Sequence, residues 1–245
     1  MALSHLARCQ AVALILPSGA AISGASAACA LGADLAGTDT PVEVSVPPHK
    51  RMSARRGISV HYGELAAGDI VQRAGIAVTS AVRTAFDLAR RGPLVEAVVG
   101  LDALLQVSAL EPEAIAEYAA AGRAGWRGVR RLGAVLALAA RGAESPMETR
   151  LRLALITAGL PRPDLQHRVL DRTGRVVARL DLAYPAYRLG IEYDGDSHWD
   201  PRAVRKDLRR QNALRALGWS LLRFTADDVV HNQVRLVKQV VAALA

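Results

Sequence analysis

The chain has 245 residues, of which 51% are hydrophobic, and a formal net charge of +8 at pH 7. This length suits two ordinary domains, and no segment approaches the ~20 consecutive apolar residues that a membrane span needs. The only cysteines, Cys9 and Cys29, are too few and too far apart for a zinc ribbon or a disulfide framework.

The basic charge is carried almost entirely by arginine, since Lys50, Lys206 and Lys238 are the only lysines. Guanidinium groups bind phosphate through two parallel hydrogen bonds, so nucleic acid is a plausible partner. A GC-rich coding sequence would produce the same composition, and charge alone does not decide. Unpaired cysteines predict a cytoplasmic protein, although the apolar run at residues 11–16 loosely imitates a signal peptide.

The first half of the chain predicts a small α+β domain that becomes helical toward its end. Its periodicity predicts two short helices within residues 1–40, strands at 42–46, 58–62 and 75–78, a helix from Thr79-Ser80 to Arg90, and helices within 93–141. We place a domain boundary near Gly142, which gives domains at 1–142 and 143–245.

The second half predicts the order α-β-β-β-α-β-α. Ser145-Pro146 is typical of a helix start, and Arg172-Thr173-Gly174 of a hairpin turn. The expected elements are a helix at 147–158, strands at 165–171, 175–184 and 187–193, a helix at 201–217, a strand at 219–224 and a helix at 232–244.

Acidic side chains follow two neighbouring strands of this half. Strand alternation places Asp181 opposite the apolar face, and places Glu192 and Asp194 on one face beside Gly190. If the two strands pair, Asp181 approaches Glu192, and carboxylates ~4 Å apart repel by up to ~4 kcal/mol at an effective dielectric near ~20. A divalent cation would remove that repulsion, and oxygen-only ligands favour Mg²⁺ or Mn²⁺ over zinc.

Each acid also has an ordinary structural interpretation. Glu148 could form an i,i+4 pair with Arg152, Asp181 could pair with Arg179, and Asp194-Gly195 is typical of a turn. An acidic helix start, an aspartate in one strand and Glu-x-Asp at the end of the next are harder to explain together, and they favour a metal site.

The same residues belong to a wider pattern. Its segments are Ser145 to Glu148, Arg179 to Pro185, Ile191 to Gly195 with His198, Asp207 with Arg210 and Leu214, and Gly218-Trp219 with Leu222 to Thr225. Residues 144–245 thereby resemble the Vsr-like endonuclease domains of the PD-(D/E)xK restriction-endonuclease superfamily. The resemblance implies a three-layer α/β/α fold around a mixed sheet, with Glu148, Asp181 and Glu192 as metal-binding acids. Asp194 occupies the position of the superfamily's lysine, which Lys206 or Arg210 could replace.

Further candidates follow the acidic strand. His198 is a candidate general base because the pKa of imidazole lies near neutrality, although a polar loop histidine would look the same. Trp199 could stack on a base, and Lys206, Arg209 and Arg210 could contact phosphate. Asp207 and Arg210 could equally form a surface ion pair three residues apart on a helix.

The N-terminal half also resembles a family. The motifs are Ser26 to Ala28 with Leu31-Gly32, Val42 to Pro47, and Val78 to Ser80 with Arg83-Thr84 and Asp87-Leu88. Residues 10–105 thereby resemble AbiEi-type antitoxins and transcriptional regulators, without the winged helix that normally precedes these motifs. A toxin or other protein partner is therefore possible. Arg83 and Asp87 favour a structural i,i+4 pair, and the basic loop from Lys50 to Arg56 could touch nucleic acid or simply be solvated.

The sequence thus predicts an α/β protein, α+β overall, that acts as a metal-dependent endonuclease, with DNA as the expected substrate. One alternative is a non-catalytic regulator of the antitoxin kind that grips nucleic acid or a toxin. Another is a nuclease directed at RNA or at branched or mismatched structures.

Overall fold

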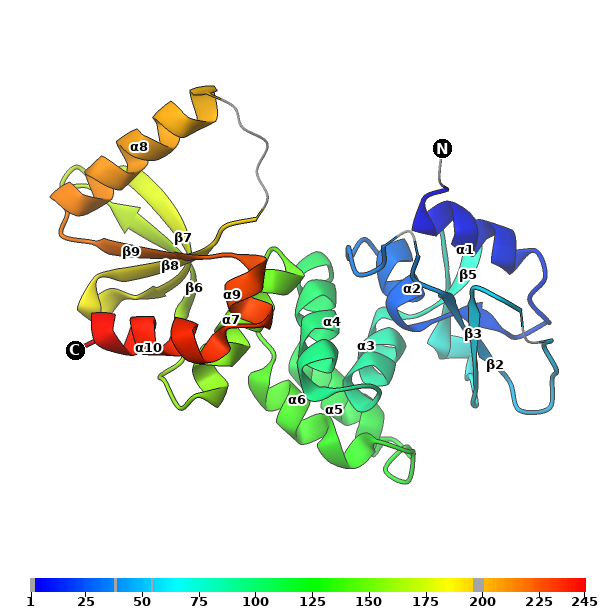
Figure 1. Ribbon diagram of the computed structural model, residues 1–245. Helices are drawn as coiled ribbons and strands as arrows, with labels where there is room; N and C mark the ends of the chain where they lie inside the picture. The colour runs from blue at the N-terminus through cyan, green and yellow to red at the C-terminus, as the bar shows by residue number, and fades with distance from the viewer. Residues whose placement is uncertain (1–2, 38, 54, 196–200) are drawn as a thin grey trace. The chain divides into compact units, whose positions relative to one another are not determined.

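A computed structural model describes residues 3–37, 39–53, 55–195 and 201–245, with only the backbone of residues 201–204. The chain divides into two compact units, Met1–Arg141 and Gly142–Ala245, and Figure 1 labels their helices and strands. Within the described residues, no helix combines the length and apolar character that a membrane-crossing segment requires.

The first unit contains a five-stranded mixed sheet in the order β3-β2-β1-β5-β4. Its elements are α1 (His5–Ala13), β1 (Ala21–Ile22), α2 (Gly24–Ala30), β2 (Val42–Val46), β3 (Ile58–Tyr62), η1 (Ala67–Asp69), β4 (Ile70–Arg73), β5 (Ile76–Thr79), α3 (Ala81–Arg90), α4 (Leu94–Val107), α5 (Pro112–Ala120), η2 (Val129–Arg131) and α6 (Leu132–Leu138). The sequence did not predict β1 and β4, because strands of two and four residues show too little alternation to be recognised.

Buried charges join the sheet of this unit to its helices. The Arg83 side chain has no solvent exposure and pairs with Asp87 at 2.9 Å and with Asp69 at 2.8 Å. Asp69 also accepts a hydrogen bond from the Tyr118 hydroxyl of α5. The structural i,i+4 pair predicted for Arg83 and Asp87 is confirmed, and Asp69 extends it into a network.

The second unit contains a four-stranded sheet in the order β6-β7-β8-β9, antiparallel except for the parallel pair β8 and β9. Its elements are α7 (Pro146–Thr157), β6 (Asp164–Leu170), β7 (Val176–Tyr184), η3 (Pro185–Tyr187), β8 (Leu189–Tyr193), α8 (Pro201–Ala216), β9 (Ser220–Phe224), α9 (Ala226–Val230) and α10 (Gln233–Ala243). The hairpin turn forms as expected, because the Asp171 carboxylate accepts the amides of Thr173 and Arg175.

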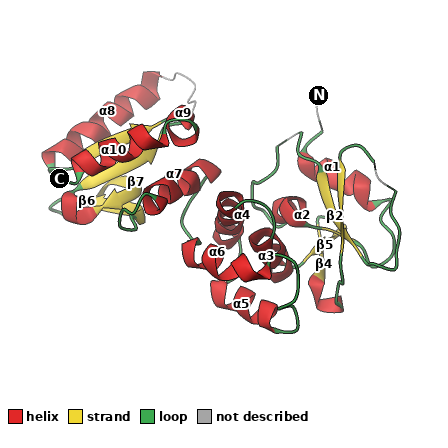
Figure 2. Ribbon diagram, turned by 60° about the horizontal axis from the view of Figure 1, so that its bottom comes forward, coloured by secondary structure: helices red, strands yellow, loops and turns green. Residues whose placement is uncertain are grey.

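Helices cover both faces of this sheet, which gives the three-layer α/β/α arrangement expected from the sequence (Figures 1 and 2). On one face, Leu214 of α8 packs on Leu180. On the other, Leu151 of α7 and Val240 of α10 share a core with Leu182. The predicted strand start at Tyr187 is wrong, because Pro185 opens a short 3-10 turn that Arg188 ends in a left-handed conformation.

Strand β7 changes its orientation at Asp181. Before this residue, Ala178 and Leu180 belong to the cluster under α8, whereas after it Leu182 and Tyr184 belong to the cluster under α7 and α10. A regular strand would keep all four even-numbered side chains on one face. The pairing with β6 is interrupted at the same position. Leu165 pairs with Leu182 and His167 pairs with Leu180, and the ladder skips Asp181 between them. Asp181 therefore lies at a local break in the sheet.

Candidate active site of the second unit

Glu148 is held in the first turn of α7 by helix capping. Ser145 is the N-cap residue, and its hydroxyl accepts the Glu148 amide at 3.2 Å. The Glu148 carboxylate turns back to accept the Glu144 amide at 2.9 Å. This side chain is only 7% exposed, so its negative charge is largely removed from water. The alternative pairing with Arg152 is not observed for Glu148, whose other acceptor contact is with Gln166.

Asp181 faces two other acids from the break in β7. Its carboxylate accepts the Tyr193 amide of β8 at 3.0 Å, where the regular ladder would otherwise continue. Burial, and then the negative charge of Glu148, raise the pKa of Asp181 to about 6, and Glu192 adds to this effect. The alternative pairing with Arg179 does not form, since Arg179 binds both oxygens of Glu144. Glu148, Asp181 and Glu192 therefore occupy one neighbourhood.

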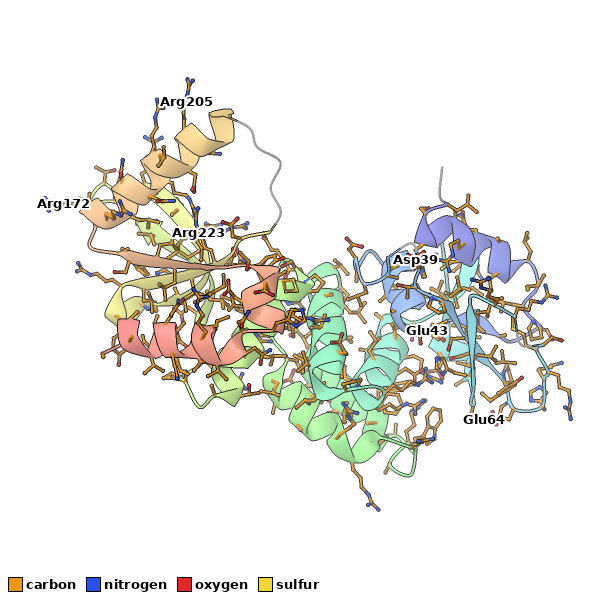
Figure 3. The ribbon with its side chains drawn as sticks, in the orientation of Figure 1. Asp39, Glu43, Glu64, Arg172, Arg205 and Arg223 are labelled. Carbon is orange, nitrogen blue, oxygen red and sulfur yellow. The ribbon has the colours of Figure 1, made fainter. Side chains whose placement is uncertain are left out.

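Glu192 differs from the other two acids because arginines neutralise it. Arg210 of α8 binds both of its carboxylate oxygens, and Arg223, its register partner on β9, approaches Oε2 at 3.4 Å. Asp207 completes the network by accepting from both arginines. Hydrogen bonding to Arg223, and secondarily to Arg210, lowers the pKa of Asp207 to about 2. Figure 3 shows Arg223 between the sheet and α8.

Gln166 of β6 completes this neighbourhood, and no pattern in the sequence pointed to it. Its Nε2 donates to Glu148 Oε2 at 3.1 Å, while its Oε1 is buried and, within the described part of the chain, has no hydrogen-bond partner. Its backbone φ of 51° is left-handed, which is rare for a residue other than glycine. Only a tertiary structure reveals such a conformation inside a segment that alternates like an ordinary strand.

The remaining sequence candidates fall into three groups. Lys206 and Arg209 are exposed on α8, as phosphate contacts would be, whereas Arg210 is engaged by Glu192 and Asp207. Asp194 is exposed just beyond β8, where its amide donates to the Phe224 carbonyl. His198 and Trp199 lie outside the described residues.

Mg²⁺ and Mn²⁺ require several oxygen donors close together. Among the residues that the structure describes, no group of three or more histidine, cysteine, aspartate or glutamate side chains is arranged to hold a metal ion. Glu148 and Asp181 nevertheless offer oxygen donors with uncompensated charge, and Gln166 offers a buried oxygen without a partner. Hard divalent cations prefer such oxygen donors. The residues present therefore fit a small oxygen-ligated cation, with two acids and one amide at its centre.

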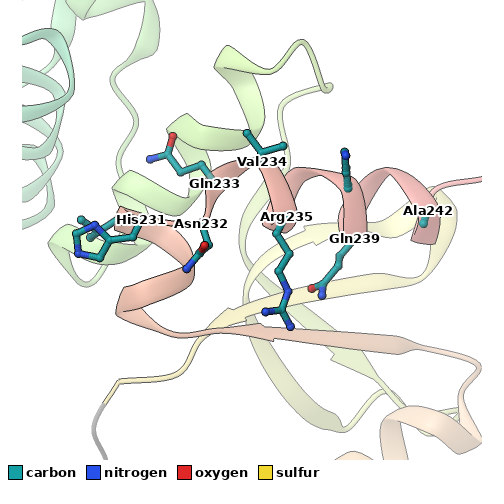
Figure 4. A pocket seen from close by; sticks show the side chains of 9 residues that line it. His231, Asn232, Gln233, Val234, Arg235, Gln239 and Ala242 are labelled. Carbon is teal, nitrogen blue, oxygen red and sulfur yellow. The ribbon is translucent and has the colours of Figure 1, made fainter.

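A separate pocket of this unit lies along α10 (Figure 4). It measures about 750 Å³ and is lined by residues that include His231, Val234, Arg235 and Lys238, without an acid among them. A pocket without carboxylates has no anionic oxygen to bind a hard divalent cation. We therefore place the candidate chemistry at the acids and not in this pocket.

Comparisons with known proteins agree with a nuclease-type domain. Residues 165–244 match REase_MTES_1575, a restriction-endonuclease-like family. This match covers only part of the second unit, so the antitoxin-like character of the first unit stays a prediction. The crystal structure of RV2827C protein from Mycobacterium tuberculosis aligns with 70% of this chain and 66% of that chain, at 18% identity and a TM-score of 0.37. That likeness is too low to support an inference about fold or function.

Two curated relatives align with most of the chain. Uncharacterized protein Rv2248 from Mycobacterium tuberculosis strain H37Rv is 34% identical over 224 residues, which cover 89% of this chain and 81% of the relative. Uncharacterized protein MT2308 from strain CDC 1551 gives the same identity and coverage. The chain therefore belongs to the protein family of Rv2248 and MT2308, and its C-terminal unit carries a restriction-endonuclease-like domain.

Proposed function

We propose that this protein is a metal-dependent endonuclease that hydrolyses phosphodiester bonds, with DNA as its substrate. The observation that carries the proposal is the crowding of negative charge at Asp181 inside a restriction-endonuclease-like domain. Neither Glu148 nor Asp181 forms an ion pair among the described residues; Glu148 is buried and Asp181 is partly buried. Two close carboxylates in such surroundings repel each other, and a divalent cation is the usual compensation.

Glu148, Asp181 and Glu192 would hold Mg²⁺ or Mn²⁺. When bound, such a cation activates water and neutralises charge that develops on the phosphate. Glu192 can contribute although Arg210 and Arg223 contact it, because a carboxylate has about four lone-pair directions and these contacts occupy fewer. The exposed position of Asp194 suits a supporting role at the rim of the site.

Arg210 would supply the positive charge that a lysine provides in the superfamily that the sequence resembles. Its guanidinium forms an ion pair with Glu192, and it forms a second ion pair with Asp207 of the same helix. Its donors have a planar arrangement that matches phosphate. We assign it to the scissile phosphate, with Asp207 as a positioning residue. His198 stays our proposed proton acceptor on sequence grounds alone.

A basic surface beside the acids would bind the nucleic acid backbone. Lys206 and Arg209 are exposed on α8. Arg168 is exposed on β6 and stands directly opposite Arg179 in the ladder with β7. Arg179 is neutralised by Glu144, whereas Arg168 has no such partner among the described residues. Arg168 is therefore the member of this pair that is available to a phosphate. Trp199 stays a sequence-based candidate for base stacking.

The test is a cleavage assay on supercoiled plasmid with Mg²⁺, with Mn²⁺ and with EDTA. We expect the wild type to nick or linearise the plasmid only with metal, and Asp181→Asn to lose at least about a hundredfold in rate, as when a transition-state-stabilising group is removed. Lys238→Gln, on α10, serves as a matched control that should cleave normally. Equal products from wild type and Asp181→Asn under all metals would overturn the proposal. Parallel assays on RNA and on branched or mismatched DNA would define the substrate.

A second function is favoured by one specific observation. The bidentate contact between Arg210 and Glu192 provides positive charge at the acids without a metal, and Asp194 replaces the superfamily's lysine. This arrangement suits a regulator that binds nucleic acid or a toxin and no longer cleaves. A gel shift that persists in EDTA, without cleavage under any metal, would support this alternative.

A further inference from the structure

We infer that Gln166 is a further residue of the candidate metal site, which places its amide oxygen on the cation held by Glu148 and Asp181. The inference rests on the proposed function for the position of the cation. It adds a neutral ligand from β6, an element that carries none of the acids.

The backbone at Gln166 departs from a regular strand beside the acids. The ladder between β6 and β7 has the pairs Leu165–Leu182 and His167–Leu180, with a break between them. Counting along the two strands, Gln166 therefore stands across from Asp181, where β7 changes its orientation. The left-handed φ of 51° lets the side chain leave the regular pleat at this point. Such backbone conformations are unfavourable for residues with a Cβ atom, and they cluster at functional sites.

The side chain of Gln166 is fixed in one orientation. Nε2 donates to Glu148 Oε2 at 3.1 Å. If the nitrogen and oxygen of this amide were exchanged, the Gln166 oxygen would face the Glu148 oxygen without a hydrogen between them. The second half of the amide is then Oε1, which is buried and has no hydrogen-bond partner among the residues that the structure describes. Buried polar atoms normally have a partner, and an ion or a water explains the exceptions. Because the neighbouring carboxylates carry uncompensated charge, a cation satisfies all three groups at once.

The competing explanation is structural. In this explanation Gln166 only anchors Glu148 through Nε2, and water occupies the position beside Oε1. The two roles differ in what glycine does at this position. Glycine adopts a left-handed φ without strain, so Gln166→Gly keeps the backbone and removes the amide. A purely structural glutamine would stabilise the chain without metal, so Gln166→Gly would then unfold at a lower temperature than the wild type in EDTA.

The experiment is a calorimetric titration of the full chain with Mn²⁺, combined with thermal unfolding in EDTA. The variants are Gln166→Gly, Gln166→Met, which keeps the length of the side chain, and Ala74→Gly, which relieves another left-handed residue at φ 50° in the first unit. We expect both Gln166 variants to weaken Mn²⁺ binding by about 10- to 100-fold, as for residues that support metal sites. Ala74→Gly should keep the wild-type affinity. Gln166→Gly should unfold in EDTA at or above the wild-type temperature, which shows that the loss of affinity is not a loss of fold.

Each outcome decides between the two proposals. Mn²⁺ binding that depends on Gln166, without cleavage of any nucleic acid, supports this inference and overturns the proposed hydrolysis. Cleavage by the wild type, with unchanged Mn²⁺ affinity in both Gln166 variants, overturns this inference alone. A wild type that neither binds Mn²⁺ nor cleaves overturns both.

Discussion

The two units treat buried charge in opposite ways. In the first unit, Arg83 has no exposure and is closed between Asp69 and Asp87. In the second, Glu148 and Asp181 lie together without an arginine of their own. Burying a charge is costly unless a partner compensates it. The acids around Arg83 therefore have a cation within the fold, whereas the acids of the second unit support the proposed binding of one from outside it.

Arg83→Ala should give the largest effect that follows from this comparison. The substitution leaves Asp69 and Asp87 buried without their central cation, which should cost about 3–5 kcal/mol of unfolding free energy. Chemical denaturation followed by the fluorescence of Trp126, which lies against Arg83, measures the change. A loss below about 1 kcal/mol would mean that the network is no more important than surface pairs.

Asp181→Asn should act in the opposite direction on stability. In EDTA at neutral pH, the variant removes one of several repelling carboxylates and retains an oxygen that can accept the Tyr193 amide. We expect a gain of about 1–2 kcal/mol, which saturating Mn²⁺ should reverse in favour of the wild type. A variant less stable than the wild type in EDTA would show that Asp181 is a structural residue like Asp87.

Arg168→Ala should weaken nucleic acid binding about 3- to 10-fold and lower the slope of affinity against salt concentration by about one. Arg235→Ala on α10 provides the matched control, because it removes the same group from an exposed position on a helix that carries none of the acids. Fluorescence anisotropy with a labelled duplex in EDTA measures both variants. Equal losses in the two would indicate nonspecific attraction to net charge.

Glu43→Gln should give the smallest effect, and one that depends on pH. Burial opposes ionisation of Glu43, but hydrogen bonds from His61 and the Ala25 amide outweigh it and lower the pKa of this carboxyl below 4.5. A lowered pKa adds stability above the unfolded value and loses it as pH falls through the folded value. The wild type should therefore lose its advantage over Glu43→Gln, at most about 1 kcal/mol, as pH falls below about 4.5. Thermal unfolding between pH 7 and 3 follows this difference.

The elements with long periodic patterns were predictable from the sequence, as was the approach of Asp181 to Glu192. Strand pairing suffices for that approach, because the register of Leu182 with Ile191 continues toward Asp181 and Glu192, although the expected alternation breaks at Asp181. The ion pairs of Glu192 were not predictable, since Arg210 and Arg223 come from a helix and a strand whose packing the sequence does not specify. Gln166 was hidden for a different reason. Its role depends on one backbone angle and on a break in a ladder, and neither leaves a trace in residue type.

The change of orientation within β7 has a consequence for how this strand tolerates substitution. In a scan that replaces each residue of β7 with a charged one, changes at Ala178 and Leu180 should disrupt the packing under α8. Changes at Leu182 and Tyr184 should disrupt the packing under α7 and α10. Charges should be tolerated only before Asp181, at positions such as Arg179, because Leu182, Ala183 and Tyr184 are all buried. Deleting one residue between Val176 and Leu180 would reverse which side chains of that segment face each helical layer. Residues 182–184, which pair with β8, would keep their register.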